Sequence, residues 1–343
     1  MKDIPFKIIE DIRDLKIQGA ENIALNGVKA LFSFIQLESD LEQINFFIIN
    51  LINARITEPT LRNAVKNLLY KTGFDQFLDF LYDNLGYDIN FYKKYYKKIE
   101  FNKDRLILNY NKVMDHFHSV QDDINQNVLN FVEKYYKHKN ILKIYTHCHS
   151  NTVALSIINL KNKLPNKKIV VYNTETRPLY QGRITALQLL DAGIDVHHFV
   201  DSGMLYCIKE CDIVMLGCDA IELNGDVINK IGSGAISFLA DNFNKPLAII
   251  TDSWKIDSKT KNKKEEIEIR NNFEIIDQEF KKQLEDRNIY IDIAPSKVIV
   301  GKYENDTTNK GRFYVKNYAF EKIRGDKVFV LITEIDFKMS RDI

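Results

Sequence analysis

Three short segments of the chain combine a reactive or charged side chain with neighbours that can bind an anion. The first covers residues 146–152, Thr-His-Cys-His-Ser-Asn-Thr, where a predicted strand ends and a predicted helix begins. A helix N-terminus stabilises negative charge, so Cys148 could be used there as a thiolate, the form of cysteine that acts as a base or nucleophile. The backbone N–H groups of Ser150, Asn151 and Thr152 could also bind a phosphate.

Two other interpretations apply to this first segment. A buried cysteine in a tight turn has the same local sequence, and spacing alone favours this structural role for Cys148 over catalysis. A zinc site formed by His147, Cys148 and His149 is less favoured, because neighbouring strand residues point to opposite faces and the chain contains no Cys-x-x-Cys pair.

The second segment covers residues 217–233 and follows an apolar predicted strand. Asp219 would emerge at the end of that strand, and a carboxyl group above an apolar floor is suited to donate a proton. Asn229 and Lys230 then lead to Gly232 and a helix, which would offer an amide, an ammonium and backbone donors to a phosphate. The structural alternatives are a turn-forming role for Asp219 and a surface charge for Lys230.

The third segment covers residues 174–183 and contains a carboxylate, two guanidiniums and an amide before a predicted helix. Gln181 could bind a ligand hydroxyl. We also expect an ion pair within this loop between Glu175 and Arg177, whether or not the loop lines a site.

The composition restricts the class of protein that could use these residues. Hydrophobic residues make up 45% and charged residues 28% of the 343 positions, which is typical of a folded globular protein. Forty-eight basic and 47 acidic residues give a net charge of +1, so no overall field attracts nucleic acid or an anionic membrane. We expect a cytoplasmic protein with free thiols, because no signal peptide, membrane-length apolar run or disulfide framework is evident.

The pattern of apolar residues predicts an α/β protein with a helical N-terminal domain followed by a Rossmann-like, mostly parallel sheet domain. Apolar residues recur with helical spacing through residues 1–115, and a polar helix within 116–139 links them to the rest. We expect residues 140–343 to form the α/β catalytic domain, with an insertion at 279–314. Its predicted strands and the helices between them imply right-handed β-α-β units. The strands are 141–146, 168–172, 195–200, 212–216, 246–251 and 328–332, and the helices are 152–160, 185–192, from 202 onward and 234–242.

Ligands bind at the carboxyl ends of the strands in sheets of this kind. Cys148 and Asp219 both follow predicted strands, so we expect the two side chains to face one cavity. We also expect the helical domain to cover that cavity.

Taken in order, these segments resemble the translation initiation factor 2B alpha/beta/delta family, which includes ribose-1,5-bisphosphate isomerases and methylthioribose-1-phosphate isomerases. The resemblance spans nearly the whole chain. It rests on the following segments: Thr146-His147-Cys148, 175–178 with Gln181-Gly182, and 224–232, together with 17–20, 54–64, 266–270, 317–320 and Thr333-Glu334.

The resemblance implies an isomerase that converts an aldose 1-phosphate into a ketose 1-phosphate, most similar to the ribose 1,5-bisphosphate enzymes. Cys148 and Asp219 would be catalytic. Groups in both domains would bind phosphate and hydroxyls without a metal or a cofactor, and the chain would form a homo-oligomer, either a dimer or a hexamer. These binding residues are Gly19, Ala20, Arg55, Gln181, Lys230 and Lys255, in addition to Ser150, Asn151, Thr152 and Asn229.

Two alternatives remain open at this point. The chain could be a non-catalytic regulatory subunit that binds a sugar phosphate or a nucleotide. It could also be a methylthioribose-1-phosphate isomerase, which Ala220 disfavours because those enzymes usually have an arginine there. Gln18, in place of the arginine of the Arg-Gly-Ala phosphate loop, and Glu21, in place of a small residue, weaken the expected contact with a second phosphate.

Overall fold

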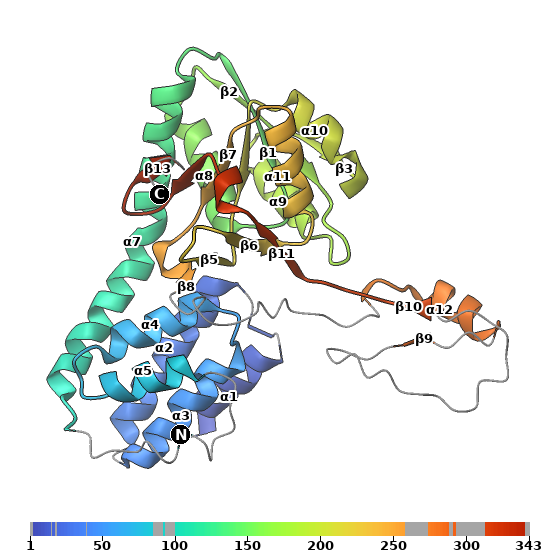
Figure 1. Ribbon diagram of the computed structural model, residues 1–343. Coiled ribbons are helices and arrows are strands. Elements are labelled where there is room, and N and C mark those ends of the chain that lie inside the picture. The colour runs from blue at the N-terminus through green and yellow to red at the C-terminus, as the bar shows by residue number, and fades with distance from the viewer. Residues whose placement is uncertain are drawn as a thin grey trace.

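A computed structural model describes residues 3–14, 16–17, 19–38, 40–84, 92, 100–257, 274–287, 291–292 and 313–339 (Figure 1). Gln18, which the sequence places in the phosphate loop, lies outside the described residues. So does most of the expected insertion, at positions 288–290 and 293–312, although α12 (Gln278–Glu285) lies within its first part.

The N-terminal half is a bundle of helices with one apolar core, as the 3.6-residue periodicity predicts. Phe34 and Phe47 stack at its centre with ring centroids 4.5 Å apart. Gly27 allows two helices to approach closely, because a Cβ atom there would lie 2.6 Å from a methyl group of Leu61. The helices are α1 (Asp3–Arg13), α2 (Ala20–Leu37), α3 (Leu41–Ala54), α4 (Pro59–Leu69), α5 (Asp75–Asp83) and the first half of α7 (Lys103–Tyr136).

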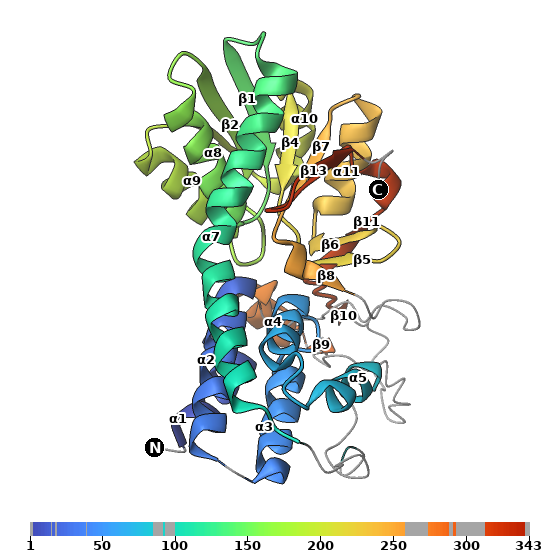
Figure 2. The same cartoon turned by 90° about the vertical axis from the view of Figure 1, so that its left-hand side faces the viewer.

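Helix α7 runs along both halves of the molecule, so that its first turns pack on the helical bundle and its last turns on the sheet (Figure 2). Phe117 belongs to the core of the bundle, whereas Val120 belongs to the core beneath the sheet. The linking segment expected at 116–139 is therefore the second part of a single 34-residue helix. A domain boundary near residue 116 would pass through the helix itself.

The C-terminal half is built on a seven-stranded sheet with strand order β13-β12-β7-β4-β1-β2-β3. Six strands of this sheet, all except β13, run parallel to one another. The edge strand β13 is antiparallel to its neighbour β12. The strands are β1 (Ile141–Thr146), β2 (Lys168–Thr174), β3 (Asp195–Phe199), β4 (Ile213–Leu216), β7 (Leu247–Ile250), β12 (Val330–Ile332) and β13 (Phe337–Met339). All six predicted strands are present, within two residues of their predicted ends.

Helices cover both faces of this sheet, which explains why its central strands are apolar runs without polar alternation. Helices α7, α8 (Asn151–Lys163) and α9 (Gln181–Asp191) pack on one face. Helices α10 (Met204–Glu210) and α11 (Ser233–Asn242) pack on the other.

A second, four-stranded sheet lies between the large sheet and the helical bundle (Figures 1 and 2). Its order is β11-β6-β5-β8, and its strands are β5 (Ala220–Glu222), β6 (Val227–Lys230), β8 (Ile256–Asp257) and β11 (Phe320–Ile323). Two of these strands, β5 and β6, lie within residues 217–233, where the sequence pattern predicted no strand. The strands are too short for a periodic pattern, and β8 and β11 join them from segments that are far apart in sequence.

Polar contacts join α4 to the end of β7 and to β8, which fixes the bundle beneath the sheet. The Arg62 guanidinium forms a 2.7 Å ion pair with Asp257. The amide of Asn63 donates to the carbonyls of Trp254 and Ile256, at 2.7 and 2.9 Å. None of the helices in the described part of the chain is both long enough and apolar enough to cross a membrane.

Candidate functional site

Three neighbouring strands of the large sheet, β1, β4 and β7, lead into the segments that carry Cys148, Asp219 and Lys255. A direct contact joins the first two segments, because a Cβ atom on Gly217 would lie 2.6 Å from the Ser150 hydroxyl oxygen. A second contact joins the last two, since the Lys255 ammonium donates to the Cys218 carbonyl at 2.6 Å. These contacts bring together segments that are up to 107 positions apart in the numbering.

The turn that carries Cys148 is held by two threonine side chains from outside it. The Cys148 N–H donates to the Thr176 hydroxyl, and its carbonyl accepts from the Thr185 hydroxyl, both at 2.9 Å. The Cys148 backbone has a φ of 66°, a left-handed conformation that costs energy for a residue with a side chain. The residue is 9% exposed, so the turn leaves its thiol nearly enclosed.

The first turn of α8 follows Cys148 as predicted. The Ser150 hydroxyl caps the helix by accepting from the Val153 N–H at 3.4 Å. Asn151 is exposed, and its side chain accepts from the Gln188 amide at 3.3 Å. Thr152 accepts from Gln121 of α7 through its carbonyl. The hydrogen bonds of Asn151 and Thr152 tie the start of α8 to the neighbouring helices.

The two histidines beside Cys148 are held by the protein framework. Burial lowers the pKa of both, so each ring is neutral near pH 7. His147 donates from Nε2 to the Ile231 carbonyl at 2.9 Å, and its Nδ1 lies 2.7 Å from the Thr174 hydroxyl. The Nδ1 of His149 lies 3.0 Å from the Thr185 hydroxyl. The ring nitrogens engaged in these bonds face hydroxyl and carbonyl groups.

The His147 ring also joins the Cys148 turn to the segment that contains Lys230. Gly232 lies directly against this ring, since a Cβ atom there would be 2.8 Å from His147 Nε2. Lys230 is 5% exposed, and its ammonium lies 5.1 Å from the centroid of the Phe320 ring. In the described part of the chain no carboxylate forms an ion pair with Lys230, so its charge remains available for an anion.

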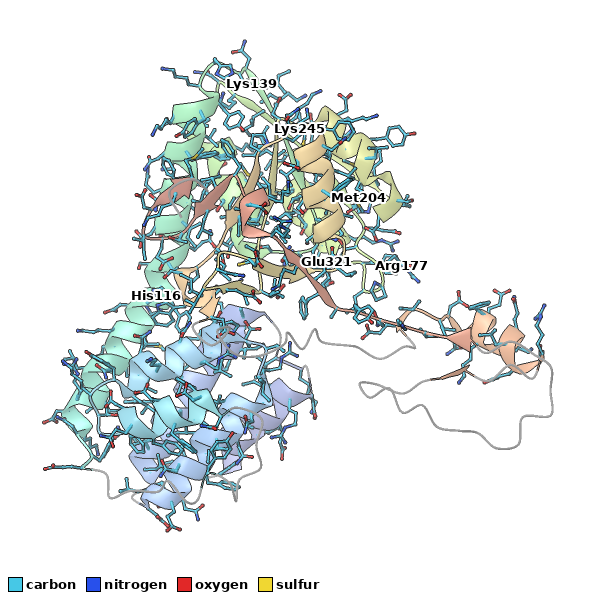
Figure 3. All side chains as sticks on the ribbon, in the orientation of Figure 1. His116, Lys139, Arg177, Met204, Lys245 and Glu321 are labelled. Carbon is cyan, nitrogen blue, oxygen red and sulfur yellow. The ribbon has the colours of Figure 1, made fainter. Side chains whose placement is uncertain are left out.

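Other groups of the same segment are already used within the protein. The Asn229 amide donates to the Ser233 hydroxyl at 2.8 Å. The N-terminus of α11 holds the Glu321 carboxylate, which accepts from the Gly234 N–H. Figure 3 shows Glu321 at the edge of the sheet domain that faces the helices. The Glu321 carboxylate therefore occupies one of the backbone donors that we expected to bind a phosphate.

The expected ion pair between Glu175 and Arg177 is absent, and that prediction was wrong. Glu175 pairs instead with Arg183 at 2.9 Å. The Asp201 carboxylate accepts from the backbone N–H of Arg177 at 2.7 Å, and the Arg177 side chain contacts Tyr180. Gln181 begins α9 beside this loop and is half-buried.

A buried carboxyl group, Glu58, lies near Asp219 and was not identified from the sequence. Burial and the charge of Asp219 raise the pKa of Glu58 to about 7, while Lys255, Arg55 and Arg62 oppose this shift. Arg55 ends α3, and its carbonyl accepts from the Glu58 N–H at 3.1 Å. The sequence did contain one indication of this residue. Glu58 immediately precedes Pro59, which starts a helix, and the surrounding stretch had already been linked to phosphate binding.

A cluster formed by His116, Asp252 and Glu334 lies beside Lys255, and the Asp252 carbonyl accepts from the Lys255 N–H at 3.1 Å. His116 lies where α7 crosses from the bundle to the sheet (Figure 3), stacks on Trp254 and contacts Asp252 at 3.1 Å. Glu334 accepts from the Ser253 N–H at 2.9 Å and from its hydroxyl. The ligand atoms of the three clustered residues lie within 4.8 Å of one another, a spacing at which they could hold a metal ion.

The start of α2 approaches the same cluster. Burial and the charge of Asp252 raise the pKa of Glu21, while Lys255 and His116 oppose the shift. Gly19, with a φ of 84°, and Ala20 stand immediately before it at the helix start. The N-terminal loop therefore lies on the Lys255 side of the junction.

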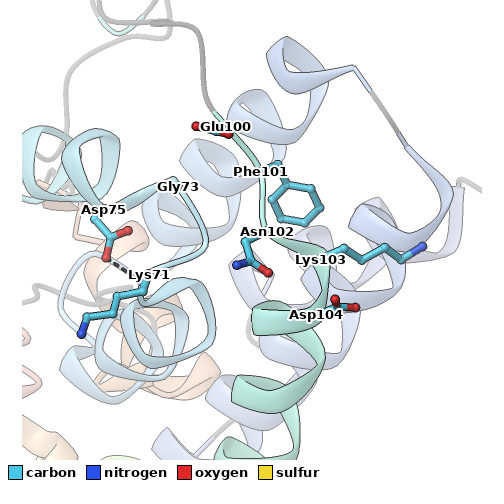
Figure 4. Close-up of a pocket in the computed structure, with 8 residues that line it drawn as sticks. All are labelled: Lys71, Gly73, Asp75, Glu100, Phe101, Asn102, Lys103 and Asp104. Carbon is cyan, nitrogen blue, oxygen red and sulfur yellow. Dashed lines mark hydrogen bonds between the residues drawn. The ribbon is translucent and has the colours of Figure 1, made fainter.

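A separate pocket lies on the helical half, away from the strand ends (Figure 4). It contains none of the residues singled out from the sequence. Its lining consists of Lys71, Gly73, Asp75, Glu100, Phe101, Asn102, Lys103 and Asp104.

Proteins with related sequences are isomerases of phosphorylated sugars. Ribose 1,5-bisphosphate isomerase from Methanocaldococcus jannaschii is 33% identical over 307 residues, which cover 87% of this chain and 88% of that protein. The enzyme of the same name from Archaeoglobus fulgidus is 30% identical over 73% of this chain and 71% of its own length. A 5-deoxyribose 1-phosphate isomerase from Clostridium botulinum is 41% identical over 38% of this chain and 41% of that protein.

Solved structures share the fold along nearly the whole chain. Translation initiation factor eIF-2B from Pyrococcus horikoshii superposes with a TM-score of 0.66 at 16% identity, covering 98% of this chain and 96% of that one. The sequence profile of the Initiation factor 2 subunit family matches residues 16–303. With this match and the M. jannaschii relative, the chain belongs to the Initiation factor 2 subunit family.

Proposed function

We propose that the protein is a sugar-phosphate isomerase that converts an aldose 1-phosphate into a ketose 1-phosphate, with ribose 1,5-bisphosphate as substrate and ribulose 1,5-bisphosphate as product. The observation that carries this proposal is the junction of the β1, β4 and β7 ends. There, Gly217 packs on Ser150 and Lys255 bonds to Cys218, so that Cys148 and Asp219 stand on contacting segments. Archaeal relatives named ribose 1,5-bisphosphate isomerase support the choice of substrate.

The reaction needs two proton transfers in each direction. The phosphate on C1 blocks simple ring opening, so Asp219 gives a proton to the ring oxygen as the bond from C1 to that oxygen breaks. Cys148, as thiolate, removes the proton from C2, which leaves a C1–C2 double bond. Cys148 returns its proton to C1, and the proton of the C2 hydroxyl goes back to Asp219 as the ketone forms. Every proton is recovered, so no cofactor is consumed.

Phosphate recognition would come from both halves of the molecule. Lys230, buried and without a carboxylate partner in the described part of the chain, would hold one phosphate. Lys255 and Arg55 would hold the substrate from the other side, at the junction with the helical bundle. The backbone of Gly19 and Ala20 would complete the site, and Gln181 would bind a hydroxyl.

The test is a panel of sugars followed for ketose formation: ribose 1,5-bisphosphate, ribose 1-phosphate, 5-deoxyribose 1-phosphate and 5-methylthioribose 1-phosphate. We expect turnover of ribose 1,5-bisphosphate and loss of turnover in Cys148→Ser and Asp219→Asn. Preference for a monophosphate would change the substrate but keep the reaction. Absence of turnover with every sugar would reject the isomerase and favour a regulatory, ligand-binding subunit.

We also propose that the protein is a homo-oligomer, at least a dimer. Helix α9 carries Ile184, Leu187 and Leu190 on one face, each at least half exposed, which is unusual for a monomer. Light scattering at micromolar concentration should give at least twice the chain mass of 40.1 kDa. A mass of one chain would contradict the proposal.

A further inference from the structure

Glu58 has no structural role that accounts for its burial. It is 6% exposed, and it immediately precedes Pro59 at the start of α4. Its side chain makes no capping bond to that helix. Its Oε1 atom is shielded from solvent and has no hydrogen-bond partner in the described part of the chain. A buried carboxyl group is costly unless it is paired or protonated, so its presence at this turn calls for a function.

The turn that carries Glu58 is fixed against the strand ends. Four residues later, Arg62 pairs with Asp257 at 2.7 Å, and Asn63 bonds to the carbonyls of Trp254 and Ile256. Trp254 and Ile256 flank Lys255, whose ammonium is bonded to the carbonyl immediately before Asp219. Two carboxyl groups from different halves of the molecule, Glu58 and Asp219, are therefore held around one lysine.

Charged groups from both halves of the molecule act on Glu58. The carboxylate of Asp219, after β4, is negative, and Lys255, Arg55 and Arg62 are positive. Burial disfavours the ionised form of Glu58, and the Asp219 carboxylate disfavours it further. Two carboxyl groups that interact strongly titrate as a pair, so the protonation of Glu58 depends on the charge of Asp219.

We propose that Glu58 is a positioning residue for the isomerase reaction. Its carboxyl group shares one proton with that of Asp219, so that Asp219 can donate this proton to the sugar ring oxygen. The shared proton passes to Asp219, which gives it to the ring oxygen, so that both carboxyl groups are ionised while the C1–C2 double bond exists. The proton released from the C2 hydroxyl when the ketone forms restores the pair. This role rests on the proposed isomerase function, and Glu58 acts through Asp219 without needing to touch the sugar.

The first test compares pH profiles of kcat for the wild type, Glu58→Gln and Glu58→Asp. The wild type should lose activity as pH rises through about 7, where the pair gives up its proton. In Glu58→Gln, Asp219 loses the neighbouring carboxyl group while the Lys255 ammonium stays, so this loss should move to lower pH by about one unit or more. Activity at pH 7.5 should then fall about ten-fold with little change in KM. Glu58→Asp keeps a carboxyl group and should keep the profile near that of the wild type.

The control is Glu133→Gln, which changes an exposed glutamate on α7 and should leave the profile unchanged. An unshifted profile in Glu58→Gln, or an equal loss of activity at every pH, would overturn the proposal, because either result describes a residue that only supports the structure.

The second test measures the shared proton without measuring activity. In protein with ¹³C-labelled glutamate carboxyl groups, the Glu58 resonance is identified by its absence in Glu58→Gln. It should titrate near pH 7 in the wild type and at least one unit lower in Asp219→Asn. A Glu58 titration that does not depend on Asp219 would overturn the proposal. Because this result does not need turnover, failure of the pair and failure of the isomerase function are separate outcomes.

Discussion

The Lys255 ammonium donates a 2.6 Å hydrogen bond to the carbonyl of Cys218, the residue immediately before Asp219. Burial disfavours the charge of Lys255, but the acidic side chains around it, those of Cys218, Asp219, Glu58 and Asp252, outweigh burial and raise its pKa. The lysine therefore stays protonated and fixes the peptide that carries Asp219. A cation from the β7 end thus orients the candidate acid at the β4 end.

Replacing Lys255 with methionine should lower kcat/KM by about 10- to 100-fold, the effect of losing one hydrogen bond from a charged group. The loss removes the bond to Cys218 and leaves Asp219 and Glu58 without their nearest cation. The measurement is steady-state kinetics with ribose 1,5-bisphosphate. Lys29→Met, at an exposed position of α2, is the matched control and should behave as the wild type. Equal activity of the two variants would show that Lys255 does not orient the site.

The Arg62–Asp257 ion pair should contribute strongly to folding, because the Arg62 side chain is only 4% exposed. Arg62→Met removes the buried guanidinium from Asp257, and we expect the free energy of unfolding to fall by about 3 kcal/mol in urea. The control lies one turn later on α4, where Lys66 and Asp79 form an exposed pair at 3.8 Å. Lys66→Met should change the free energy of unfolding by less than about 0.5 kcal/mol. Similar values for the two variants would contradict a stabilising contact between the bundle and the sheet.

Glu58 should make stability depend on pH between its unfolded and folded pKa values. The native state holds the Glu58 proton up to about pH 7, whereas the unfolded chain releases it near 4.5, so stability falls as pH rises through this window. Each pKa unit corresponds to about 1.4 kcal/mol, which gives a loss of about 3 kcal/mol by pH 8. Glu58→Gln should therefore be more stable than the wild type at pH 8, and the difference should shrink below pH 5. Urea unfolding at both pH values measures this, and a difference that does not change with pH would contradict it.

The four thiols should react very differently with iodoacetamide in the native protein at pH 8. Burial raises the pKa of Cys207 and Cys211 to about 12 and that of Cys218 to about 11, so these thiols stay protonated. Cys148, at the start of α8, should be the residue that is alkylated, and activity should fall in parallel. Mass spectrometry of the digested protein identifies the site. Labelling of Cys218 before Cys148 would contradict the role of Cys148 as the reactive thiol.

The sequence by itself determined six of the seven strands of the large sheet, because most of them are local apolar runs separated by amphipathic helices. It also indicated Cys148 and Asp219, since residues that follow such strands share one edge of a parallel sheet. The position of Cys148 between β1 and α8 agrees with this reading. The catalytic roles of both residues remain predictions.

Only the tertiary structure decided the second sheet and the partners of the charged residues. Strands of two to four residues have no period to detect, and β5 meets β8 and β6 meets β11 only after the chain has folded. Glu175 pairs with Arg183, and the Asp201 carboxylate, from a distant segment, accepts from the backbone N–H of Arg177. Glu58 looked like an ordinary helix start. Its proximity to Asp219 depends on the docking of α4 against the strand ends, and burial together with a second carboxylate is what changes its chemistry.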